Sequence, residues 1–323
     1  MKALICISPG HMAYRDVAAP VMEKGRAILR IRRTGICGTD IHAYGGNQPY
    51  FAYPRILGHE LSGDLVDADG AEGFVPGEAV TFIPYYHCGH CNACRQGKTN
   101  CCVEMKVCGV HVDGGMVEYL SVPSASLVKN EGLDHDELAL VEPLAIGAHG
   151  IRRAGIRPGE SVLIFGAGPI GLGLAAFAKI AGGDVTVADV NRERLAFCRQ
   201  ETDVQTLHPD ALGSMAADVV IDATGNLAAM NNALRYLAHG GRYVLVGLQK
   251  EALSISHPEL HKREGAVMSS RNATREDFEQ VVEAIRLKKI NPVAFITHRV
   301  SFDELGSLMA DFPRQAIKVM VDH

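Results

Sequence analysis

Four closely spaced cysteines are the clearest chemical signal in this sequence. They follow the pattern C-x2-C-x2-C-x7-C and are Cys88, Cys91, Cys94 and Cys102. Four thiolates in so short a segment can surround a tetrahedral Zn²⁺ and leave no open position, which is typical of a structural zinc site. A disulfide pair or an iron–sulfur cluster are the alternatives. The neighbouring Cys101 is either a packed thiol or an alternative fourth ligand.

A second metal site can be assembled from residues that lie further apart in the chain. Its candidate ligands are Cys37 in GICGTD, His59 and Glu60 in LGHE, and Glu142 in VEP. A thiolate, an imidazole and a carboxylate suit zinc, and three protein ligands plus water leave the open position that catalysis requires. Each residue alone also fits an ordinary place in a folded core. The spacing leaves open whether they converge.

A glycine-rich turn predicts a dinucleotide site. Residues 166–171 read GAGPIG, which fits G-x-G-x-x-G, and the apolar strand SVLIF precedes them. Gly166 allows the tight turn, Gly168 lets the backbone approach the pyrophosphate, and Gly171 lets helix and strand pack closely. Pro169 and Ile170 open the helix whose N-terminus would face the phosphates. An ordinary strand-to-helix turn is the alternative.

The end of the next strand indicates which dinucleotide binds. Asp189 follows the glycine-rich turn by about twenty residues, where a carboxylate accepts hydrogen bonds from the ribose hydroxyls of NAD. It would also repel the 2′-phosphate of NADP. Arg192 and Arg194 follow closely, and their positive charges are evidence for NADP instead. We favour NAD, with Arg194 lying along the adenine or the ribose.

Two later strand ends are expected to hold the nicotinamide half of the cofactor. Ligands of open parallel sheets bind outside the carboxyl ends of the strands. The residues at or just beyond these ends are Thr224, Val246, Gly247 and Leu248.

The elements that must position these residues change in character near residue 145. Before it, short apolar stretches are broken by Gly, Pro and Asp, which is typical of a β-rich domain. They are residues 27–31, 63–66 and 79–83. After it, strands and helices alternate in the βαβ order of a doubly wound α/β sheet. The expected strands are 161–165, 184–188, 218–222 and 242–246, and the expected helices are 169–181, 192–200 and 228–238.

The last part of the chain returns to the earlier character. Residues 276–288 predict an amphipathic helix, and residues 296–300 and 317–321 predict short strands. We therefore expect both ends of the chain to meet in one domain, with the nucleotide-binding domain inserted between them.

Composition excludes several other classes of protein. The 323 residues carry a formal net charge of −5, which argues against general affinity for nucleic acid. Hydrophobic residues make up 47% and charged residues 21%, enough to fill sizeable cores. No apolar run reaches the roughly 18 residues of a membrane span, and the first residues lack the apolar core of a secretory signal. We expect a cytoplasmic protein of two domains that binds neither nucleic acid nor membrane.

Taken in order, these motifs resemble those of the zinc-dependent medium-chain alcohol and polyol dehydrogenases. The resemblance covers nearly the whole chain and is strongest to the branch with sorbitol, threonine and sugar-acid dehydrogenases, because Glu142 stands where liver-type alcohol dehydrogenases have a cysteine. Stretches such as GVHVDGGMVEYLSVP and SSRNATREDF look most like the L-galactonate and L-gulonate 5-dehydrogenase-type members. A shortened link after the GHE segment departs from the family pattern but removes no motif residue.

The resemblance implies a domain organisation and an assembly. A GroES-like catalytic domain would occupy residues 1–144 and be completed by residues 286–323. A Rossmann NAD-binding domain would occupy residues 145–285. The protein would form a homodimer or homotetramer.

The resemblance also implies roles at the catalytic site. Cys37 and His59 would bind the catalytic zinc, and either Glu60 or Glu142 would complete the ligand set. Zinc would act as a Lewis acid on the substrate hydroxyl. Thr39 would hydrogen-bond the substrate oxygen and His42 would pass the proton toward solvent, while a hydride moves to the nicotinamide.

The substrate implied by the resemblance is a secondary alcohol in a polyol or sugar acid, such as L-galactonate or L-gulonate. Residues that could read its hydroxyls or carboxylate are Asn47, Gln48, Arg271 and Asn272. Arg271 can pair bidentately with an acid, although it can equally clamp a backbone or a subunit interface. L-Threonine or another alcohol is an alternative substrate. A non-catalytic NAD-binding protein and a zinc-free quinone reductase are alternative functions.

Overall fold

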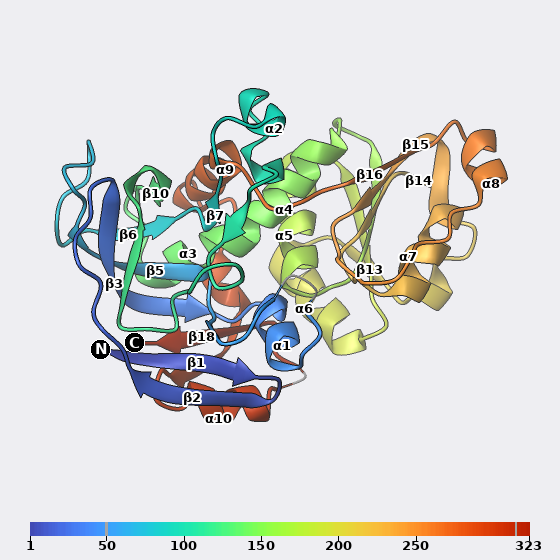
Figure 1. The fold of residues 1–323 in the computed structure, drawn as a ribbon. Helices are drawn as coiled ribbons and strands as arrows, with labels where there is room; N and C mark the ends of the chain where they lie inside the picture. Colours follow the sequence, from blue (N-terminus) through green and yellow to red (C-terminus); the bar gives the residue numbers. More distant parts are fainter. Residues whose placement is uncertain (49–50, 314) are drawn as a thin grey trace. The chain divides into compact units, whose positions relative to one another are not determined.

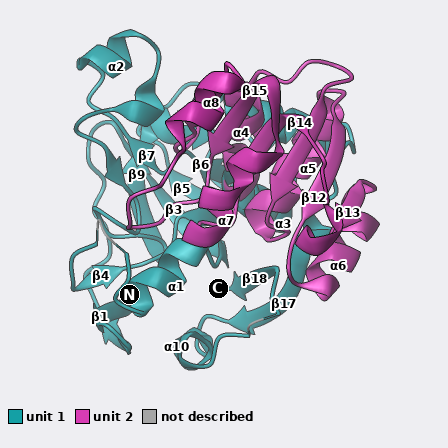
Figure 2. Ribbon diagram, turned by 90° about the vertical axis from the view of Figure 1, so that its right-hand side faces the viewer, with its two compact units in different colours: residues 1–142, 274–323 teal, residues 143–273 magenta. Residues whose placement is uncertain are grey.

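The computed structural model describes residues 1–48, 51–313 and 315–323. They form two compact units, one of residues 1–142 with 274–323 and the other of residues 143–273 (Figure 2). We call them unit 1 and unit 2. Within the described ranges, no helix has the length and apolar character needed to cross a membrane.

Unit 2 is built on a six-stranded parallel sheet (Figure 1). Its strands are β11 (Ser161–Phe165), β12 (Asp184–Ala188), β13 (Gln205–Leu207), β14 (Ala217–Asp222), β15 (Leu237–Leu245) and β16 (Ala266–Ser269). Their spatial order, β13-β12-β11-β14-β15-β16, is the 3-2-1-4-5-6 order of the Rossmann fold. The expected doubly wound sheet is thereby confirmed. The continuous apolar run of β11 suits a central strand whose two faces are both covered.

Helices connect the strands of unit 2. They are α4 (Val141–Ala154, the first two residues in unit 1), α5 (Pro169–Ile180), α6 (Arg192–Thr202), α7 (Leu227–Ala233) and α8 (His257–Lys262), with short 3₁₀ turns at Pro209–Ala211 and Leu234–Tyr236. The expected helix at 228–238 ends earlier, because Leu237 already pairs with Ala217 at the start of β15. Buried Leu163, Val220 and Tyr243 form part of the core beside this sheet.

Unit 1 is dominated by antiparallel strands. Its largest sheet has the order β10-β6-β5-β3-β18-β17, with β9 also paired to β3. These strands are β3 (Arg26–Gly35), β5 (Glu60–Asp67), β6 (Ala79–Phe82), β9 (Tyr119–Pro123), β10 (Leu127–Val128), β17 (Ile296–Ser301) and β18 (Lys318–Asp322). Smaller sheets contain β1 (Lys2–Ser8), β2 (His11–Asp16), β4 (Arg55–Ile56), β7 (Tyr85–Tyr86) and β8 (Lys106–Val107).

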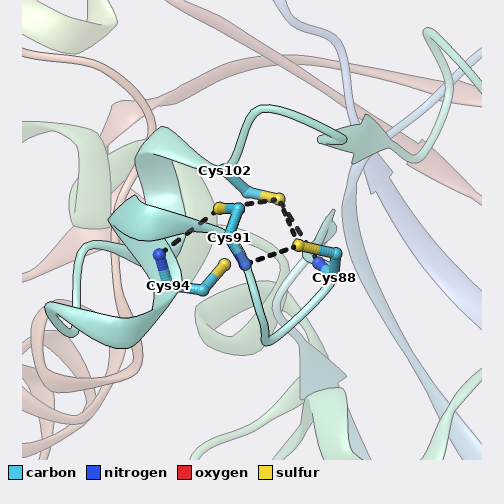
Figure 3. Close-up of side chains that lie close together, drawn as sticks. All are labelled: Cys88, Cys91, Cys94 and Cys102. Atoms are coloured by element: carbon cyan, nitrogen blue, oxygen red, sulfur yellow. Dashed lines mark hydrogen bonds between the residues drawn. The ribbon is translucent and has the colours of Figure 1, made fainter.

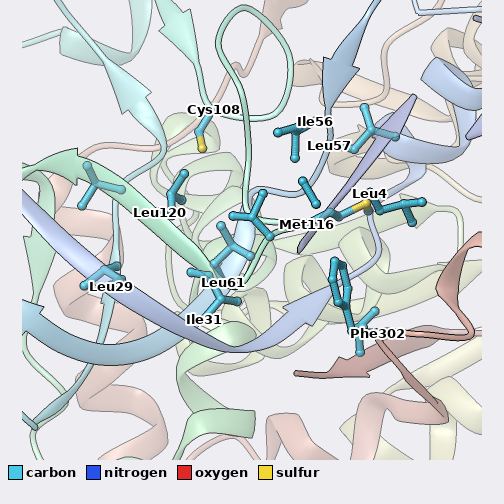
Figure 4. Close-up of a cluster of buried hydrophobic side chains, with 14 of the residues drawn as sticks. Leu4, Leu29, Ile31, Ile56, Leu57, Leu61, Cys108, Met116, Leu120 and Phe302 are labelled. Carbon is cyan, nitrogen blue, oxygen red and sulfur yellow. The ribbon is translucent and has the colours of Figure 1, made fainter. Parts of the chain in front are cut away.

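The end of the chain completes the main sheet of unit 1. Strand β18 pairs antiparallel with β3, placing Met320 opposite Gly35 and Val321 opposite Thr34. Both chain ends therefore lie in this unit (Figure 1). The buried side chains beneath the sheets come from both parts of the sequence, including Leu61, Met116 and Phe302 (Figure 4).

Helices of unit 1 lie between or after these strands. They are α1 (Gly38–Tyr44), α2 (Asn92–Arg95), α3 (His135–Ala139), α9 (Arg275–Arg286) and α10 (Leu305–Ala310), with 3₁₀ turns at Thr99–Cys101, Ser124–Ser126 and Pro292–Phe295. Helix α9 lies in unit 1, whereas the expected nucleotide-binding domain ran through residue 285. Arg275 donates hydrogen bonds to the carbonyls of Ala125 and Leu127, and the ring of Phe278 packs against Tyr85. These contacts join α9 to the rest of unit 1.

A network of charges joins α3 to three strands of unit 1. Asp136 on α3 accepts a hydrogen bond from Arg33 Nε at 2.7 Å and is paired with Arg299 on β17. Both arginines also contact Asp322 on β18, at 3.1 and 3.2 Å. Burial alone would raise the pKa of Asp136, but the hydrogen bonds from Arg299 and Arg33 outweigh it and lower this pKa.

This network predicts a pH-dependent loss of stability in Asp136→Asn. The arginines stabilise the ionised form of the Asp136 carboxylate. Its contribution to folding stability is therefore fully present above the unfolded-state pKa of about 3.9 and is lost as the pH falls through the lower folded-state pKa. We expect the substitution to cost about 1–2 kcal/mol at pH 7 and much less at pH 3, measured as the change in thermal midpoint. Asp303→Asn, at the exposed pair with Lys2, is the control and should change little. An equal loss at both pH values would contradict the assignment.

Candidate active site

The four cysteines of the predicted structural site come together in a small lobe of unit 1 (Figure 3). Their Sγ atoms all lie within 4.8 Å of one another, and we call this group the cysteine lobe. Cys102 Sγ lies 3.5 Å from Cys88 Sγ and 4.0 Å from Cys91 Sγ. At a Zn–S distance of about 2.3 Å, the edge of a ZnS₄ tetrahedron is roughly 3.8 Å. The cysteine lobe therefore has the size of a tetrahedral thiolate site.

Backbone N–H groups point at the sulfurs of the cysteine lobe. Cys91 N donates to Cys88 Sγ at 3.3 Å, and Glu104 N donates to Cys102 Sγ at 3.3 Å. Desolvation raises the pKa of Cys88 and that of Cys94, whereas backbone hydrogen bonds from Cys94 and Val103 lower the pKa of Cys91 to about 6. Such donors favour the thiolate form, which is the form that binds metal.

Neither Cys101 nor the nearby pair of His90 and Glu104 changes the assignment of the cysteine lobe as a four-thiolate site. All the cysteines are free thiols, and Cys101 is exposed and outside the group of four. Exposed His90 and Glu104 form a second cluster with Cys88, with His90 Nε2 3.2 Å from Glu104 Oε1. Because this cluster shares Cys88, it is an extension of the lobe and no separate site.

The first candidate catalytic ligand begins helix α1. Cys37 is the N-cap residue, and its Sγ accepts a hydrogen bond from Thr39 N at 3.5 Å. The helix N-terminus favours a negative charge at this position. Asp40 closes the capping box by accepting from Cys37 N at 2.9 Å. The sulfur of Cys37 thus has a defined place at the start of the helix.

Asp40 also ties the Cys37 turn to the segment that carries His59. Its fully buried carboxylate accepts from Gly58 N at 3.2 Å, and its Oδ1 lies 3.9 Å from His59 Nδ1. That ring nitrogen is buried and has no hydrogen-bond partner. The electrostatic surroundings of the His59 ring also include Cys37 and Glu142, both of which favour a positive charge there.

The two candidate carboxylates have different partners. Glu142, at the start of α4, is buried and accepts a hydrogen bond from the hydroxyl of Tyr85. Burial raises the pKa of Glu142 to about 7, and the nearby Glu60 adds to the rise, while His59 opposes it. Glu60 instead forms a buried ion pair with Lys318 of β18, whose Nζ lies 2.7 Å from Oε1 and 2.5 Å from Oε2. Both oxygens of Glu60 are engaged, whereas one oxygen of Glu142 accepts from Tyr85.

The candidate catalytic ligands are neighbours without the compactness of the cysteine lobe. Among the described residues, no three of the ligand atoms of Cys37, His59, Glu60 and Glu142 all come within 4.8 Å of one another. Their donor set nevertheless fits zinc, because a thiolate, an imidazole and a buried carboxylate are borderline ligands that a divalent cation would neutralise.

The residues expected to handle the proton lie on α1. Thr39 is in its first turn and is half-buried, while His42 is exposed one turn later. Residues three apart lie on the same helix face. Asn47 is exposed and Gln48 half-buried just beyond the helix. Pro49 and Tyr50, which follow Gln48, lie outside the described residues.

The glycine-rich turn of unit 2 has the conformation that a dinucleotide site requires. Gly166 has a φ of 104°, and a Cβ added to Gly171 would overlap the carbonyl oxygen of Gly166. Gly168 is the N-cap of α5, and a Cβ there would meet nothing within 4 Å. Pro169 occupies the first helical turn and is followed by Ile170. Only glycine permits both the turn and the close packing.

Asp189 lies beside this turn, as predicted from its spacing. Its Oδ2 accepts from Ala167 N at 2.7 Å and its Oδ1 from Asn191 N at 2.7 Å. Asn191 then caps α6 by accepting from Arg194 N at 3.0 Å. The carboxylate is therefore held at the carboxyl end of β12, next to the predicted pyrophosphate position.

The candidates for the nicotinamide half lie just past β14 and β15. Thr224 Oγ1 donates to Asp222 Oδ1 at 2.5 Å. Val246 N and Gly247 N donate to the Asp222 carbonyl at 2.9 and 3.0 Å. Leu248 is 60% exposed. These residues share the strand-end edge of the sheet with the glycine-rich turn.

The remaining substrate candidates follow β16 in unit 2. Arg271 is exposed, and Asn272 has a φ of 52° with a buried Nδ2 that has no hydrogen-bond partner. Asn47 and Gln48 belong to unit 1.

Three residues near the candidate catalytic ligands were not predicted from the sequence. They are Asp40, Tyr85 and Lys318. Asp40 had a detectable signal, because it is the third residue after Cys37 and completes a capping box. Lys318 had a weaker signal, because a lysine within the apolar run IKVMV is unusual. Tyr85 had no signal in the sequence.

Comparison with known proteins identifies the class that this fold and these sites define. Residues 23–132 match the alcohol dehydrogenase GroES-like domain, and residues 169–286 match the zinc-binding dehydrogenase domain. The chain is 46% identical to L-galactonate-5-dehydrogenase of Escherichia coli K12 over 95% of its own length and 93% of that protein. It therefore belongs to the zinc-binding, medium-chain alcohol dehydrogenase family and is an oxidoreductase. The resemblance found in the sequence is confirmed.

Solved structures of relatives agree over the whole chain. A dehydrogenase from E. coli CFT073, RspB, crystallised with NADH, has a TM-score of 0.93 at 27% identity and covers 100% of this chain and 99% of its own. A zinc-binding dehydrogenase from Sinorhizobium meliloti bound to NADP has the same TM-score at 28% identity, with the same coverage. Both neighbours were crystallised with a nicotinamide dinucleotide.

Proposed function

We propose that this enzyme oxidises a secondary alcohol of a polyol or sugar acid, such as L-galactonate or L-gulonate, and transfers the hydride to NAD. The observation that carries the substrate class is the 46% identity to an L-galactonate-5-dehydrogenase along nearly the full length of both chains. The two sets of zinc-type ligands and the dinucleotide turn supply the parts that such a reaction needs.

The catalytic metal would be held by Cys37, His59 and Glu142. Glu142 is preferred over Glu60, because Lys318 engages both oxygens of Glu60. When bound, zinc supplies Lewis-acid chemistry that lowers the pKa of a coordinated hydroxyl group. The cysteine lobe would hold a second, structural zinc, because four thiolates leave no position for substrate.

The chain's own groups would move the proton and orient the substrate. At the start of α1, the hydroxyl oxygen of Thr39 can accept a hydrogen bond from the substrate hydroxyl, whose proton then leaves along this bond. His42, exposed one turn later, can pass that proton to solvent. Gln48 and Arg271 are candidates for reading the further hydroxyls or the carboxylate, together with Asn47 and Asn272. The largest contribution of such positioning residues is to hold the hydride-donating carbon of the substrate at a fixed distance and angle from the nicotinamide.

The cofactor preference is proposed to be NAD. Asp189 is held at the end of β12 by two backbone N–H groups, so a ribose 2′-phosphate would meet a fixed negative charge. The residues proposed to contact the dinucleotide are Gly166, Gly168, Pro169, Ile170, Gly171, Asp189, Arg194, Thr224, Val246, Gly247 and Leu248.

Asp189→Ser is expected to shift this preference. Loss of hydrogen bonds to a charged group costs about 1.5–3 kcal/mol, so kcat/KM for NAD should fall roughly 10- to 150-fold. The value for NADP should rise, because the repelling charge is gone. Initial rates with each cofactor at a fixed substrate concentration test this. An unchanged NAD to NADP ratio would remove Asp189 from the specificity site.

The proposed reaction is tested by NAD reduction, followed at 340 nm, with L-galactonate, L-gulonate, polyols and L-threonine. Chelator-sensitive reduction with one sugar acid or polyol supports the proposal. Reduction only with L-threonine would replace the substrate class. Silence with every candidate, in protein that holds two zinc ions per chain and binds NADH, would refute the substrate and leave the class of enzyme intact.

The assembly and location are part of the proposal. We propose a homodimer or homotetramer in the cytoplasm that acts on a small molecule. Sedimentation equilibrium of the purified enzyme distinguishes these states from a monomer.

A further inference from the structure

A single buried ammonium group contacts two of the three segments that carry the proposed catalytic ligands. Lys318 is 3% exposed, and its Nζ donates to Glu60 Oε1 at 2.7 Å, Glu60 Oε2 at 2.5 Å and the carbonyl of Ile36 at 3.1 Å. Ile36 immediately precedes Cys37, and Glu60 immediately follows His59. One side chain therefore bridges the neighbours of two ligands.

The backbone of β18 fixes where this ammonium group lies. Ile36 N donates to the carbonyl of Val319 at 3.0 Å, and Met320 pairs with Gly35. Lys318 is thus tied by main-chain contacts to the turn that leads to Cys37. Its charge is held in place and cannot swing to solvent.

Gly35 leaves the space that Glu60 occupies in this pair. A Cβ built on Gly35 would overlap Glu60 Oε2 and would lie 3.0 Å from Glu60 Cβ. The Glu60 side chain therefore packs directly over the backbone of β3. This packing and the Lys318 ion pair act together to hold one orientation of the carboxylate.

A buried lysine is a costly way to fill this position. Burying an ammonium group is unfavourable, and an apolar side chain of similar volume often replaces a buried ion pair without loss of stability. The charge therefore points to a task beyond packing. The charges around it include Cys37 and Glu142 besides Glu60, and a catalytic zinc must keep one position open for substrate.

We propose that Lys318 is a positioning residue that holds Glu60 away from the catalytic metal and so keeps the fourth coordination position open. The inference rests on the proposed metal site of Cys37, His59 and Glu142. Without the ammonium group, the Glu60 carboxylate would be drawn to the remaining positive charge, the metal, and would compete there with substrate.

The test uses full-length enzyme with Co²⁺ in the catalytic site and zinc retained in the cysteine lobe. Azide is the probe of the open position, and its binding is followed by the visible absorption of cobalt. We expect Lys318→Met to change the cobalt spectrum before azide is added and to weaken azide binding roughly 10- to 100-fold, the usual effect of removing a partner of a metal ligand shell. Lys318→Arg keeps the charge and should bind azide like the wild type.

A second pair of variants separates positioning from folding. In Glu60→Gln the competing carboxylate is absent, so adding Lys318→Met to it should leave azide affinity and the cobalt spectrum unchanged. This comparison also stands if Lys318→Met alone fails to fold. A fall in azide affinity of more than tenfold in the double variant relative to Glu60→Gln would overturn the proposal, as would an unchanged spectrum and affinity in folded Lys318→Met.

Failure of the underlying metal site gives a different result. Cys37→Ala that still shows the catalytic cobalt band would refute the proposed ligands, whatever Lys318 does. Loss of that band in Cys37→Ala, together with a wild-type response of Lys318→Met, would refute only the role of Lys318.

Discussion

Cys37→Ala is expected to abolish turnover while leaving a folded protein that still binds NADH. Cys37 is the proposed thiolate ligand and caps α1, the helix that carries Thr39 and His42. Removing one group that stabilises charge in an active site lowers kcat by about 10²–10³-fold, and loss of the ligand removes the metal's contribution as well. We therefore expect kcat to fall by at least roughly 10³-fold.

His59→Ala should have the same effect. The effects of substituting residues that act as one unit are not additive. The kcat of the Cys37→Ala/His59→Ala double variant should therefore be little lower than that of either single variant. NADH binding should persist in all three, because the glycine-rich turn and Asp189 are unaltered in unit 2. Steady-state kinetics, NADH fluorescence titration and zinc analysis measure these quantities.

Cys101→Ser is the matched control for the loss of a thiol. Cys101 is exposed and lies outside the group of four sulfurs, so its variant should retain turnover and zinc content. Undiminished turnover in Cys37→Ala or His59→Ala would remove these residues from the catalytic site. A fall in Cys101→Ser would instead support the register in which Cys101 serves as a ligand.

Cys91→Ser is expected to lower both stability and zinc content. Cys91 caps α2, and its sulfur lies 4.0 Å from that of Cys102. Binding free energy at a structural zinc site is folding free energy, because the unfolded chain offers no preformed site. We expect one zinc ion per chain to be lost and the free energy of unfolding to fall by about 3–5 kcal/mol, at the upper end for single substitutions.

A loss of this size corresponds to a fall of roughly 6–20 °C in the thermal midpoint for a unit of this size. Differential scanning calorimetry and metal analysis of the same preparation provide the test. Cys198→Ser, at a buried thiol in unit 2, is the control and should keep the metal content of the wild type. Retention of two zinc ions per chain in Cys91→Ser would contradict the structural role of the cysteine lobe.

Much of unit 2 was predictable from local sequence. The expected strands at 161–165 and 184–188 coincide with β11 and β12, and the turn between β11 and α5 carries its glycines where predicted. These features depend on residues a few positions apart, since an apolar run, a tight turn and a helix N-terminus are short-range properties. The missed strands were β13 and β16, edge strands of only three and four residues, and helices α4 and α8 were not predicted either.

The candidate catalytic site was only partly predictable. The motifs named Cys37, His59, Glu60 and Glu142, but their spacing left two carboxylates competing for one role. The structure distinguishes them by their partners, Tyr85 for Glu142 and Lys318 for Glu60. Neither partner stands in a motif with its carboxylate.

Sequence alone determined the class of fold, the cysteine lobe and the dinucleotide turn, because each follows from the spacing of nearby residues. Tertiary structure alone decided which charges meet. Lys318 and Glu60 are 258 positions apart and become neighbours only because β18 pairs with β3 and β3 pairs with β5. Pairing between distant strands depends on how the whole core packs. No local pattern therefore specifies the ion pair by which Glu60 differs from Glu142 as a candidate ligand.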